Sequence, residues 1–305
     1  MPELPEVETV VNELRPKLKN KKIKDVRILM PKMVAMGPAT LSNLRKPGEK
    51  LAEEFARTLK GQKITDVSRR AKLIIIDLAG KYAILVHLKM TGQLIFLDKK
   101  HLDKQIKLLN IENYTPVRLP AKSTHVIFEF TDGSKLFYND FRQFGYLKLV
   151  TDKELPHVKE LAEFGPEPLD EKFTLAVFRQ ILAKRPNAVL KSFLLDPKMI
   201  AGIGNIYSDE IMYFAKVRPT RVLKTLSDKE QQQLFKGIKK ILQDAVDHYG
   251  SSVGDFVRPS GDWGTYGLLH KVYGRAGEKC KVCGNIIKSL KFNGRTSSYC
   301  PNCQK

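Results

Sequence analysis

Four cysteines near the end of the chain constrain its fold more than any other feature of the sequence. Cys280 and Cys283 form one pair, Cys300 and Cys303 form another, and sixteen residues separate the two pairs. Two residues between the members of a pair let a tight turn direct both thiolates at one metal ion. The alternatives are two disulfides or unpaired thiols. Because all four ligands would be protein thiolates, we predict one structural Zn2+, with no open position for catalysis, in a zinc finger over 277–305.

The net charge of the chain indicates a negatively charged partner. There are 53 Lys and Arg residues against 33 Asp and Glu, a net charge of +20 at pH 7, and the 42% of hydrophobic residues is ordinary for a globular protein. A folded protein this basic favours a nucleic acid, because each neutralised phosphate releases counterions. A ribosome-associated protein with scattered lysines is the alternative.

The sequence contains no sign of a membrane segment or an export signal. No run reaches the roughly 18 consecutive apolar residues of a membrane helix. The first six residues carry two glutamates, where an export signal would have a basic segment followed by an apolar one. We therefore expect a cytoplasmic protein without a membrane partner, in a reducing compartment where cysteine pairs bind metal more often than they form disulfides.

The first half of the chain predicts one helix followed by a β-sandwich or barrel. Apolar residues recur at three- and four-residue steps from Leu4 to Leu18, and the prolines Pro2 and Pro5 are tolerated at the start of such a helix. Short strand-like runs follow, and the dipeptide Asp132-Gly133 between two of them is typical of a hairpin turn. This pattern predicts a domain over 1–150. The expected strands are 23–29, 73–78, 82–88, 93–97, 125–131, 135–138 and 146–150.

The second half of the chain changes to a helical pattern. Ser227-x-x-Glu230 is a capping box at the start of the last helix, and a glycine follows the end of that helix. Five glycines and the only tryptophan lie within 250–267, which favours a mobile loop. We therefore expect a helical domain over 151–250 and a loop and linker over 251–276, ahead of the zinc finger. The expected helices are 171–185, 188–195, 205–216 and 227–249.

Two further strands are expected between the cysteine pairs, at 288–292 and 297–299. They would place Gly294-Arg295 at the tip of a hairpin. An arginine at such a tip can enter a groove of DNA.

The first six residues combine prolines with two glutamates. Proline at position 2 is small enough for Met1 to be removed, and removal would expose a secondary amine on Pro2 that can condense with an aldehyde-like sugar carbon. A free α-amine has a pKa of about 8, below that of lysine, and a helix N-terminus disfavours its protonated form further. Glu3 and Glu6 lie one helical turn apart, so both can take part in proton transfer near the amine. An ordinary helix start, with Pro and Glu in the first turn, is the alternative.

Together with the cysteine tail, the N-terminal sequence closely resembles the formamidopyrimidine-DNA glycosylases, the bifunctional repair enzymes for oxidised purines. The resemblance covers nearly the whole chain, and several motifs in the order of the family are more specific than any one of them. The motifs are PELPEVET at 2–9, RAK at 70–72, HLKMTG at 87–92, DFRQFG at 140–145, GIGNIY at 202–207, YGR at 273–275 and Arg295 ahead of Tyr299-Cys300.

The resemblance implies an α+β fold with a helix-flanked N-terminal β-sandwich, a helical helix–two-turn–helix domain and a β-hairpin zinc finger. It implies a monomeric glycosylase and AP lyase that acts on double-stranded DNA containing an oxidised base, such as 8-oxoguanine, and that reaches the nucleoid by binding this DNA.

The resemblance also implies roles for single residues. Pro2 is then the nucleophile that attacks C1′ of the damaged nucleotide, and the resulting Schiff base is followed by β,δ-elimination. Glu3 assists base loss and sugar ring opening, and Glu6 is a supporting polar residue of the pocket. Lys72 binds the phosphate beside the lesion, with a solvated lysine at a strand end as the alternative.

Further residues correspond to DNA contacts of the family. Met90, Arg142 and Phe144 match the trio that fills the gap left by the everted base, where an apolar wedge, a guanidinium and a ring can replace stacking and pairing. Core packing is the alternative for Met90 and Phe144. Asn205 and Arg295 match the pair that contacts the phosphates flanking the lesion.

The sequence departs from the family at several places. Gln143 stands where a second arginine is usual, so one phosphate or opposite-base contact lacks its usual residue. The loop at 250–267 corresponds to the one that closes over the flipped base in the family, and its stretch 250–256 lacks the basic residue of some relatives. The segments 31–59 and 99–122 are irregular or enlarged beside typical members, and the sequence assigns them no role. Glu210 resembles a glutamate of the lesion pocket.

Two other functions are compatible with parts of the sequence. The endonuclease VIII-like glycosylases remove oxidised pyrimidines and share the nucleophile, the helix pair and the finger. Leu4, where that class typically has glycine, and the trio with Met90 and Phe144 argue against it. A non-catalytic zinc-finger protein that binds nucleic acid would account for the charge, Asn205 and the cysteines, but not for the N-terminal Pro-Glu pair.

Overall fold

The structure is a computed structural model that describes most of the chain. The described residues are 1–38, 48–103, 117–254, 256–292 and 294–305. Parts of the two enlarged segments, 39–47 and 104–116, therefore lie outside the described residues, as do Asp255 of the glycine-rich loop and Asn293 beside the hairpin tip.

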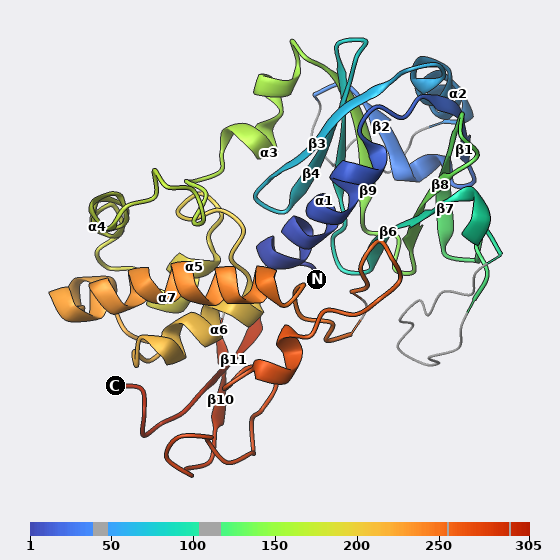
Figure 1. The fold of residues 1–305 in the computed structure, drawn as a ribbon. Helices are drawn as coiled ribbons and strands as arrows, with labels where there is room; N and C mark the ends of the chain where they lie inside the picture. The colour runs from blue at the N-terminus through green and yellow to red at the C-terminus, as the bar shows by residue number, and fades with distance from the viewer. Residues whose placement is uncertain (39–47, 104–116, 255, 293) are drawn as a thin grey trace. The chain divides into compact units, whose positions relative to one another are not determined.

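The chain divides into two compact units, which we call the sandwich unit and the helical unit (Figure 1). The sandwich unit contains Met1–Glu163 and Tyr249–Gly264, and the helical unit contains Phe164–His248 and Thr265–Lys305. Each unit buries an apolar core of its own. The cysteine-rich tail is part of the helical unit, and most of the glycine-rich segment is part of the sandwich unit.

The sandwich unit has two sheets. One has the strand order β1-β7-β8-β6 and the other β2-β9-β5-β4-β3, and all neighbours are antiparallel except β2 and β9. The strands are β1 (Ile23–Ile28), β2 (Val34–Met36), β3 (Ile64–Arg70), β4 (Leu73–Leu78), β5 (Tyr82–His87), β6 (Gly92–Leu97), β7 (Thr124–Phe130), β8 (Lys135–Asp140) and β9 (Tyr146–Thr151). The sequence pattern does not predict β2, which is very short, or β3. A bulge in β3 between Ile64 and Asp66 puts its buried residues three positions apart, which hides the alternation of a strand.

The helices of the sandwich unit pack on its sheets. They are α1 (Leu4–Leu18), α2 (Glu49–Leu59) and α3 (Lys159–Ala162), with 3-10 turns η1 (Pro31–Met33), η3 (Lys99–His101) and η4 (Leu155–His157). The sequence analysis did not predict α2, which lies in one of the two irregular segments. Its buried residues Ala52, Phe55 and Leu59 recur at three- and four-residue steps, as in an amphipathic helix.

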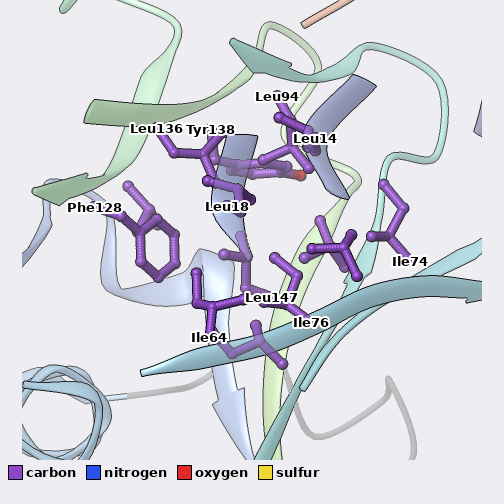
Figure 2. Close-up of a cluster of buried hydrophobic side chains, with 14 of the residues drawn as sticks. Leu14, Leu18, Ile64, Ile74, Ile76, Leu94, Phe128, Leu136, Tyr138 and Leu147 are labelled. Carbon is purple, nitrogen blue, oxygen red and sulfur yellow. The ribbon is translucent and has the colours of Figure 1, made fainter. Parts of the chain in front are cut away.

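Helix α1 is fixed by the main core of the sandwich (Figure 2). Leu14 and Leu18 are fully buried. Burying one leucine side chain contributes about 1.5–3 kcal/mol, so two of them hold the helix firmly. The side chains around them come from both sheets and include Ile64, Ile74, Ile76, Leu147, Leu94, Phe128, Leu136 and Tyr138. The position of the chain's N-terminus is therefore set by the sandwich core.

The helical unit contains four helices and a hairpin among its described residues. These are α4 (Leu175–Ala183), α5 (Leu190–Leu195), α6 (Asn205–Phe214), α7 (Asp228–Asp247), β10 (Lys288–Phe292) and β11 (Arg295–Tyr299), with 3-10 turns η5 (Leu223–Thr225) and η6 (Tyr266–Leu269). The predicted capping box is present, with Ser227 N–H donating to Oε2 of Glu230 at 2.8 Å. The sequence pattern places Arg295 at the tip of the hairpin. In the structure Arg295 is the first residue of β11 and pairs with Phe292, so it lies beside the turn and not at its tip.

The glycine-rich segment is packed against the sandwich unit. Its described residues from 249 to 264 form neither helix nor strand, as expected. Pro259 O accepts the N–H of Phe96 in the edge strand β6 at 3.0 Å, and Val257 is buried. Arg258 forms an ion pair with Glu13 of α1. Among the described residues of the whole chain, no helix is long and apolar enough to cross a membrane.

Candidate functional site

The first residues of the chain form a buried helix start. Pro2, Glu3 and Glu6 are buried, whereas Met1 is 45% exposed. The N–H of Glu3 donates to Oε2 of Glu6 at 2.7 Å, and the carboxylate of Glu3 accepts the N–H of Glu6. This reciprocal pair is a capping box, and it fixes both carboxylates close to Pro2. Hydrolysis of the first peptide bond would convert the nitrogen of Pro2 into a secondary amine in this setting.

Glu6 also holds the glycine-rich segment. Its Oε1 accepts the N–H of Ser251 at 2.7 Å. Gly250 has a φ of +78°, and a Cβ on it would lie 2.9 Å from the same oxygen. A larger residue would be strained there and would displace the carboxylate. One buried carboxylate therefore joins the amide of Glu3 to the amide of Ser251.

Lys72 lies in the turn between β3 and β4, where its charge acts on the ring of His87. Ala71 before it has a φ of +54°, a left-handed conformation that costs a non-glycine residue on the order of 1 kcal/mol or more. Burial lowers the pKa of His87 well below its usual value, and the charges of Lys89 and Lys72 lower it further. The His87 ring is therefore neutral at pH 7. Because its Nδ1 accepts the N–H of Lys89 at 3.0 Å, Nε2 carries the proton.

His87 was not among the residues singled out by the sequence analysis. It stands in the motif at 87–92, but a lone histidine gives no signal of its own. Only the fold brings it, at the end of β5, into the field of Lys72.

Met90, Arg142 and Phe144 lie on two turns that leave the sheets. Met90 is 37% exposed and Phe144 is 52% exposed, so neither belongs to the core. The guanidinium of Arg142 lies 4.8 Å from the centroid of the Phe144 ring, a cation–π contact. Lys89 and Gln143 beside them have φ values of +50° and +56°. Strained, exposed turns that carry apolar side chains are typical of binding surfaces.

In the helical unit, Asn205 begins α6 beside the hairpin. Its Nδ2 donates to the carbonyl of Thr296 at 2.9 Å, which places the start of α6 next to the residue that follows Arg295. The second N–H of this amide can still donate to an acceptor such as a phosphate oxygen. Arg295 is exposed. The resemblance implies that Asn205 and Arg295 act as a pair, and both belong to this one unit.

A buried ion pair joins α5, α6 and β11. Lys191 Nζ lies 2.6 Å from Oδ1 of Asp209, and both side chains are 0% exposed. The same Oδ1 accepts the hydroxyl of Ser297, and Oδ2 accepts the N–H of Ser298 at 2.8 Å. Burial raises the pKa of Asp209, and the ammonium of Lys191 with the two serine donors opposes this shift. The sequence does not predict this pair, because a lysine and an aspartate 18 positions apart give no local pattern.

Glu210 supports the backbone ahead of the zinc finger. Its carboxylate accepts the N–H groups of Lys271, Val272 and Tyr273, at 2.9 Å for each closest contact. Burial raises the pKa of Glu210, and the three amides oppose the shift. The side chain is 1% exposed, so its oxygens are directed at this segment of backbone.

The four cysteines form one metal site. Their Sγ atoms all lie within 4.8 Å of one another, and Cys283 to Cys300 and Cys280 to Cys303 are 3.4 and 3.9 Å apart. A disulfide requires about 2.05 Å, so these are free thiols. Zn–S bonds of about 2.3 Å in a tetrahedron put the sulfurs about 3.8 Å apart. The donor set therefore fits one structural Zn2+, as predicted.

Comparison with known proteins gives the same picture over the whole length. Family models match residues 1–147 as a formamidopyrimidine-DNA glycosylase N-terminal domain, 164–257 as a formamidopyrimidine-DNA glycosylase H2TH domain, and 277–305 as a zinc finger found in FPG and IleRS. A formamidopyrimidine-DNA glycosylase from Pelotomaculum thermopropionicum is 39% identical over 100% of this chain and 99% of the relative.

Solved structures of a Lactococcus lactis relative have the same fold. A variant of that Fpg in complex with DNA containing Fapy-dG has a TM-score of 0.82 and 30% identity, over 100% of both chains. The wild-type enzyme with DNA containing an oxidised pyrimidine has a TM-score of 0.81, again at 30% identity and 100% of both chains.

A β-sandwich with a buried N-terminal Pro-Glu helix start, a helix–two-turn–helix and a four-cysteine finger define a DNA-binding repair glycosylase. Its partner is DNA. More narrowly, the chain belongs to the formamidopyrimidine-DNA glycosylase family, whose members excise oxidised purines and typically also act as AP lyases.

Proposed function

We propose that this chain excises oxidised purines from duplex DNA by covalent catalysis at Pro2. The observation that supports this most directly is the buried cluster of Pro2, Glu3 and Glu6 at the start of α1. After removal of Met1, the Pro2 nitrogen is a secondary amine next to the capping box of Glu3 and Glu6. Such an amine can act as a nucleophile toward a sugar carbon.

The reaction then proceeds in four stages. The Pro2 nitrogen forms a bond to C1′, and the glycosidic bond breaks with its electron pair and a proton leaving on the base. The C1′–O4′ bond opens to give an iminium ion, with Glu3 as the proton donor to O4′. Loss of a C2′ proton expels the 3′ phosphate by β-elimination, and δ-elimination expels the 5′ phosphate. Water then hydrolyses the iminium and restores the amine.

Glu6 supports this chemistry without taking part in the bond changes. Its two oxygens hold the amides of Glu3 and Ser251. It therefore couples the position of the general acid to the docking of the glycine-rich segment. Closure of that segment would exclude water from the flipped base.

The remaining predicted residues bind DNA. Lys72 contacts the phosphate beside the lesion, and Met90, Arg142 and Phe144 fill the gap that the everted base leaves. Asn205 and Arg295 bind backbone phosphates through the second amide N–H and the exposed guanidinium. Glu210 acts through the backbone at 271–273. We propose that the protein does this as a monomer in the cytoplasm, on the DNA of the nucleoid.

Borohydride trapping tests the proposed nucleophile. The protein is incubated with a duplex carrying 8-oxoguanine opposite cytosine, and borohydride then reduces the iminium to a stable adduct. We expect a covalent complex with the native chain and none with Pro2→Leu, in which the bulkier residue retains Met1. An adduct that survives Pro2→Leu would contradict the mechanism.

A second substrate class has one observation in its favour. The Lactococcus lactis relative has been crystallised with DNA that contains an oxidised pyrimidine. A parallel duplex with an oxidised pyrimidine ranks the two classes by kcat/KM. Faster excision of the pyrimidine would favour the endonuclease VIII-like assignment.

A further inference from the structure

Two exposed turns of the sandwich unit run side by side between its sheets. One turn, residues 88–91, leads from β5 to β6, and the other, residues 141–145, leads from β8 to β9. Strands β6 and β8 are neighbours in one sheet, with Gly92 opposite Asp140, and β5 and β9 are neighbours in the other, with His87 opposite Tyr146. The first turn carries Met90 and the second carries the Arg142–Phe144 pair.

A buried chain of hydrogen bonds joins these turns. The Thr91 hydroxyl donates to Oδ1 of Asp140 and accepts the N–H of Arg142 at 2.9 Å. Asp140 Oδ2 accepts the N–H of Gly145 at 2.7 Å, which closes the second turn. Thr91 is 2% exposed and Asp140 is 0% exposed. We call Thr91 and Asp140 the turn bridge.

A further hydrogen bond and two close backbone contacts hold the turn bridge in place. The carbonyl of Asp140 lies 2.8 Å from Nε2 of His125, a buried side chain on β7. A Cβ on Gly145 would lie 2.6 Å from the carbonyl of His87, and a Cβ on Gly92 would lie 2.4 Å from the carbonyl of Leu88. The first turn therefore closes tightly on itself, and the end of the second turn packs against the end of β5 with no room for a side chain at Gly145.

We propose that Asp140 and Thr91 are positioning residues for the gap-filling trio. This inference rests on the proposed function of Met90, Arg142 and Phe144. Side chains that replace a base in the stack must keep their spacing while the duplex closes on them. The φ values of +50° at Lys89 and +56° at Gln143 persist only if the surroundings fix them. Charge-assisted hydrogen bonds in a buried site supply such fixation, and they do so without contacting DNA.

A matched pair of variants at Thr91 isolates the turn bridge. Thr91→Val keeps the shape and removes the hydroxyl, so both the Arg142 amide and the Asp140 carboxylate lose a partner. Thr91→Ser keeps the hydroxyl. Each variant is assayed on two substrates, a duplex with 8-oxoguanine opposite cytosine and a single-stranded oligonucleotide with a preformed abasic site. The second needs Pro2 but no gap filling, so it also reports whether the variant is folded.

We expect Thr91→Val to lower single-turnover excision from the duplex by at least about tenfold, which is about 1.4 kcal/mol. Borohydride trapping on the single strand should stay within about twofold of the native chain, and Thr91→Ser should restore excision. Asp140→Asn, which cannot accept both hydrogen bonds in the same way, should reproduce the loss on the duplex.

A double-mutant cycle with Phe144 tests whether the bridge acts through the trio. In a Phe144→Ala background, Thr91→Val should lower duplex excision by less than about twofold further, because the side chain to be positioned is gone. If the fold losses of Thr91→Val and Phe144→Ala multiplied in the double variant, the inference would be overturned. It would also be overturned if Thr91→Val lost equal activity on both substrates, or if it left duplex excision unchanged. Absence of any adduct with the native chain would instead refute the proposed function at Pro2.

Discussion

Replacing Lys191 by methionine tests the buried ion pair of the helical unit. Methionine is close to lysine in length and apolar, so the change leaves the Asp209 carboxylate without its cation in a site that is 0% exposed. Breaking one side of a buried pair costs about 3–5 kcal/mol, because the remaining charge is uncompensated. Two serine contacts to the carboxylate remain, so we expect a loss of about 3 kcal/mol.

Two reporters distinguish the units in a urea titration of the full chain. Zinc release, followed with a chelating dye, reports on the helical unit, and fluorescence of Trp263, the only tryptophan, reports on the sandwich unit. With a urea dependence of about 2 kcal/mol per M, a 3 kcal/mol loss lowers the zinc-release midpoint by about 1.5 M. The Trp263 transition should move much less.

Lys240→Met is the matched control. It removes the same side chain from an exposed pair with Asp244 in α7 of the same unit. Exposed pairs of this kind contribute only a few tenths of a kcal/mol, so its midpoint should stay close to that of the native chain. If Lys191→Met shifted zinc release no more than Lys240→Met does, the assignment of a stabilising buried pair would be wrong.

Three further predictions concern the pH dependence, the glycine-rich segment and the metal. Burial lowers the pKa of His270 to about 4, so the native state disfavours its protonation. Stability of the helical unit should be full above about pH 6.5 and fall by up to about 3 kcal/mol toward pH 4, a loss that His270→Phe reduces in zinc-release titrations. In Gly250→Ala the new Cβ would meet the Glu6 carboxylate, so excision should be at least about tenfold slower. Gly254→Ala is the control, because Gly254 also has a positive φ but no atom close to a Cβ, and excision should slow less. Cys283→Ser should weaken zinc binding and lower the affinity for duplex DNA in a fluorescence anisotropy titration. The urea unfolding transition reported by Trp263 should stay unchanged, and an affinity equal to that of the native chain would contradict a structural role for the metal.

Much of the candidate site could be predicted because its signals are local or concentrated in motifs. The cysteine spacing predicts the metal site, since thiolates two residues apart share one turn. Glu3 and Glu6 are one helical turn apart, so their spacing predicts that they lie close together, and the structure shows that they form a capping box. The strand alternation predicts most of the sandwich, and it fails at β3, where a bulge breaks the period.

Other features depend on residues that are distant in the chain. Asp140 reaches Thr91 across 49 positions, and Glu6 reaches Ser251 across 245. Neither partner has a pattern of its own, because a threonine, an aspartate or a serine is found in any loop. Burial gives these contacts their weight, since a hydrogen bond to a carboxylate away from water is much stronger than the same contact at the surface.

The sequence alone predicted the family and the zinc ligands, and the resemblance carried by its motifs singled out Pro2, Glu3 and Glu6 as the candidate catalytic residues. The zinc ligands follow from residue type and spacing within one short segment, whereas the family and the roles of Pro2 and its two glutamates come from motifs spread over the whole chain. Tertiary structure decided that Glu6 joins the N-terminus to the glycine-rich segment and that His87 is neutral in the field of Lys72. It also decided that the turns carrying Met90, Arg142 and Phe144 are joined by buried hydrogen bonds. Each of these features depends on which side chains the fold brings into contact and buries away from water. The order of residues along the chain gives neither the distance between two such side chains nor their burial.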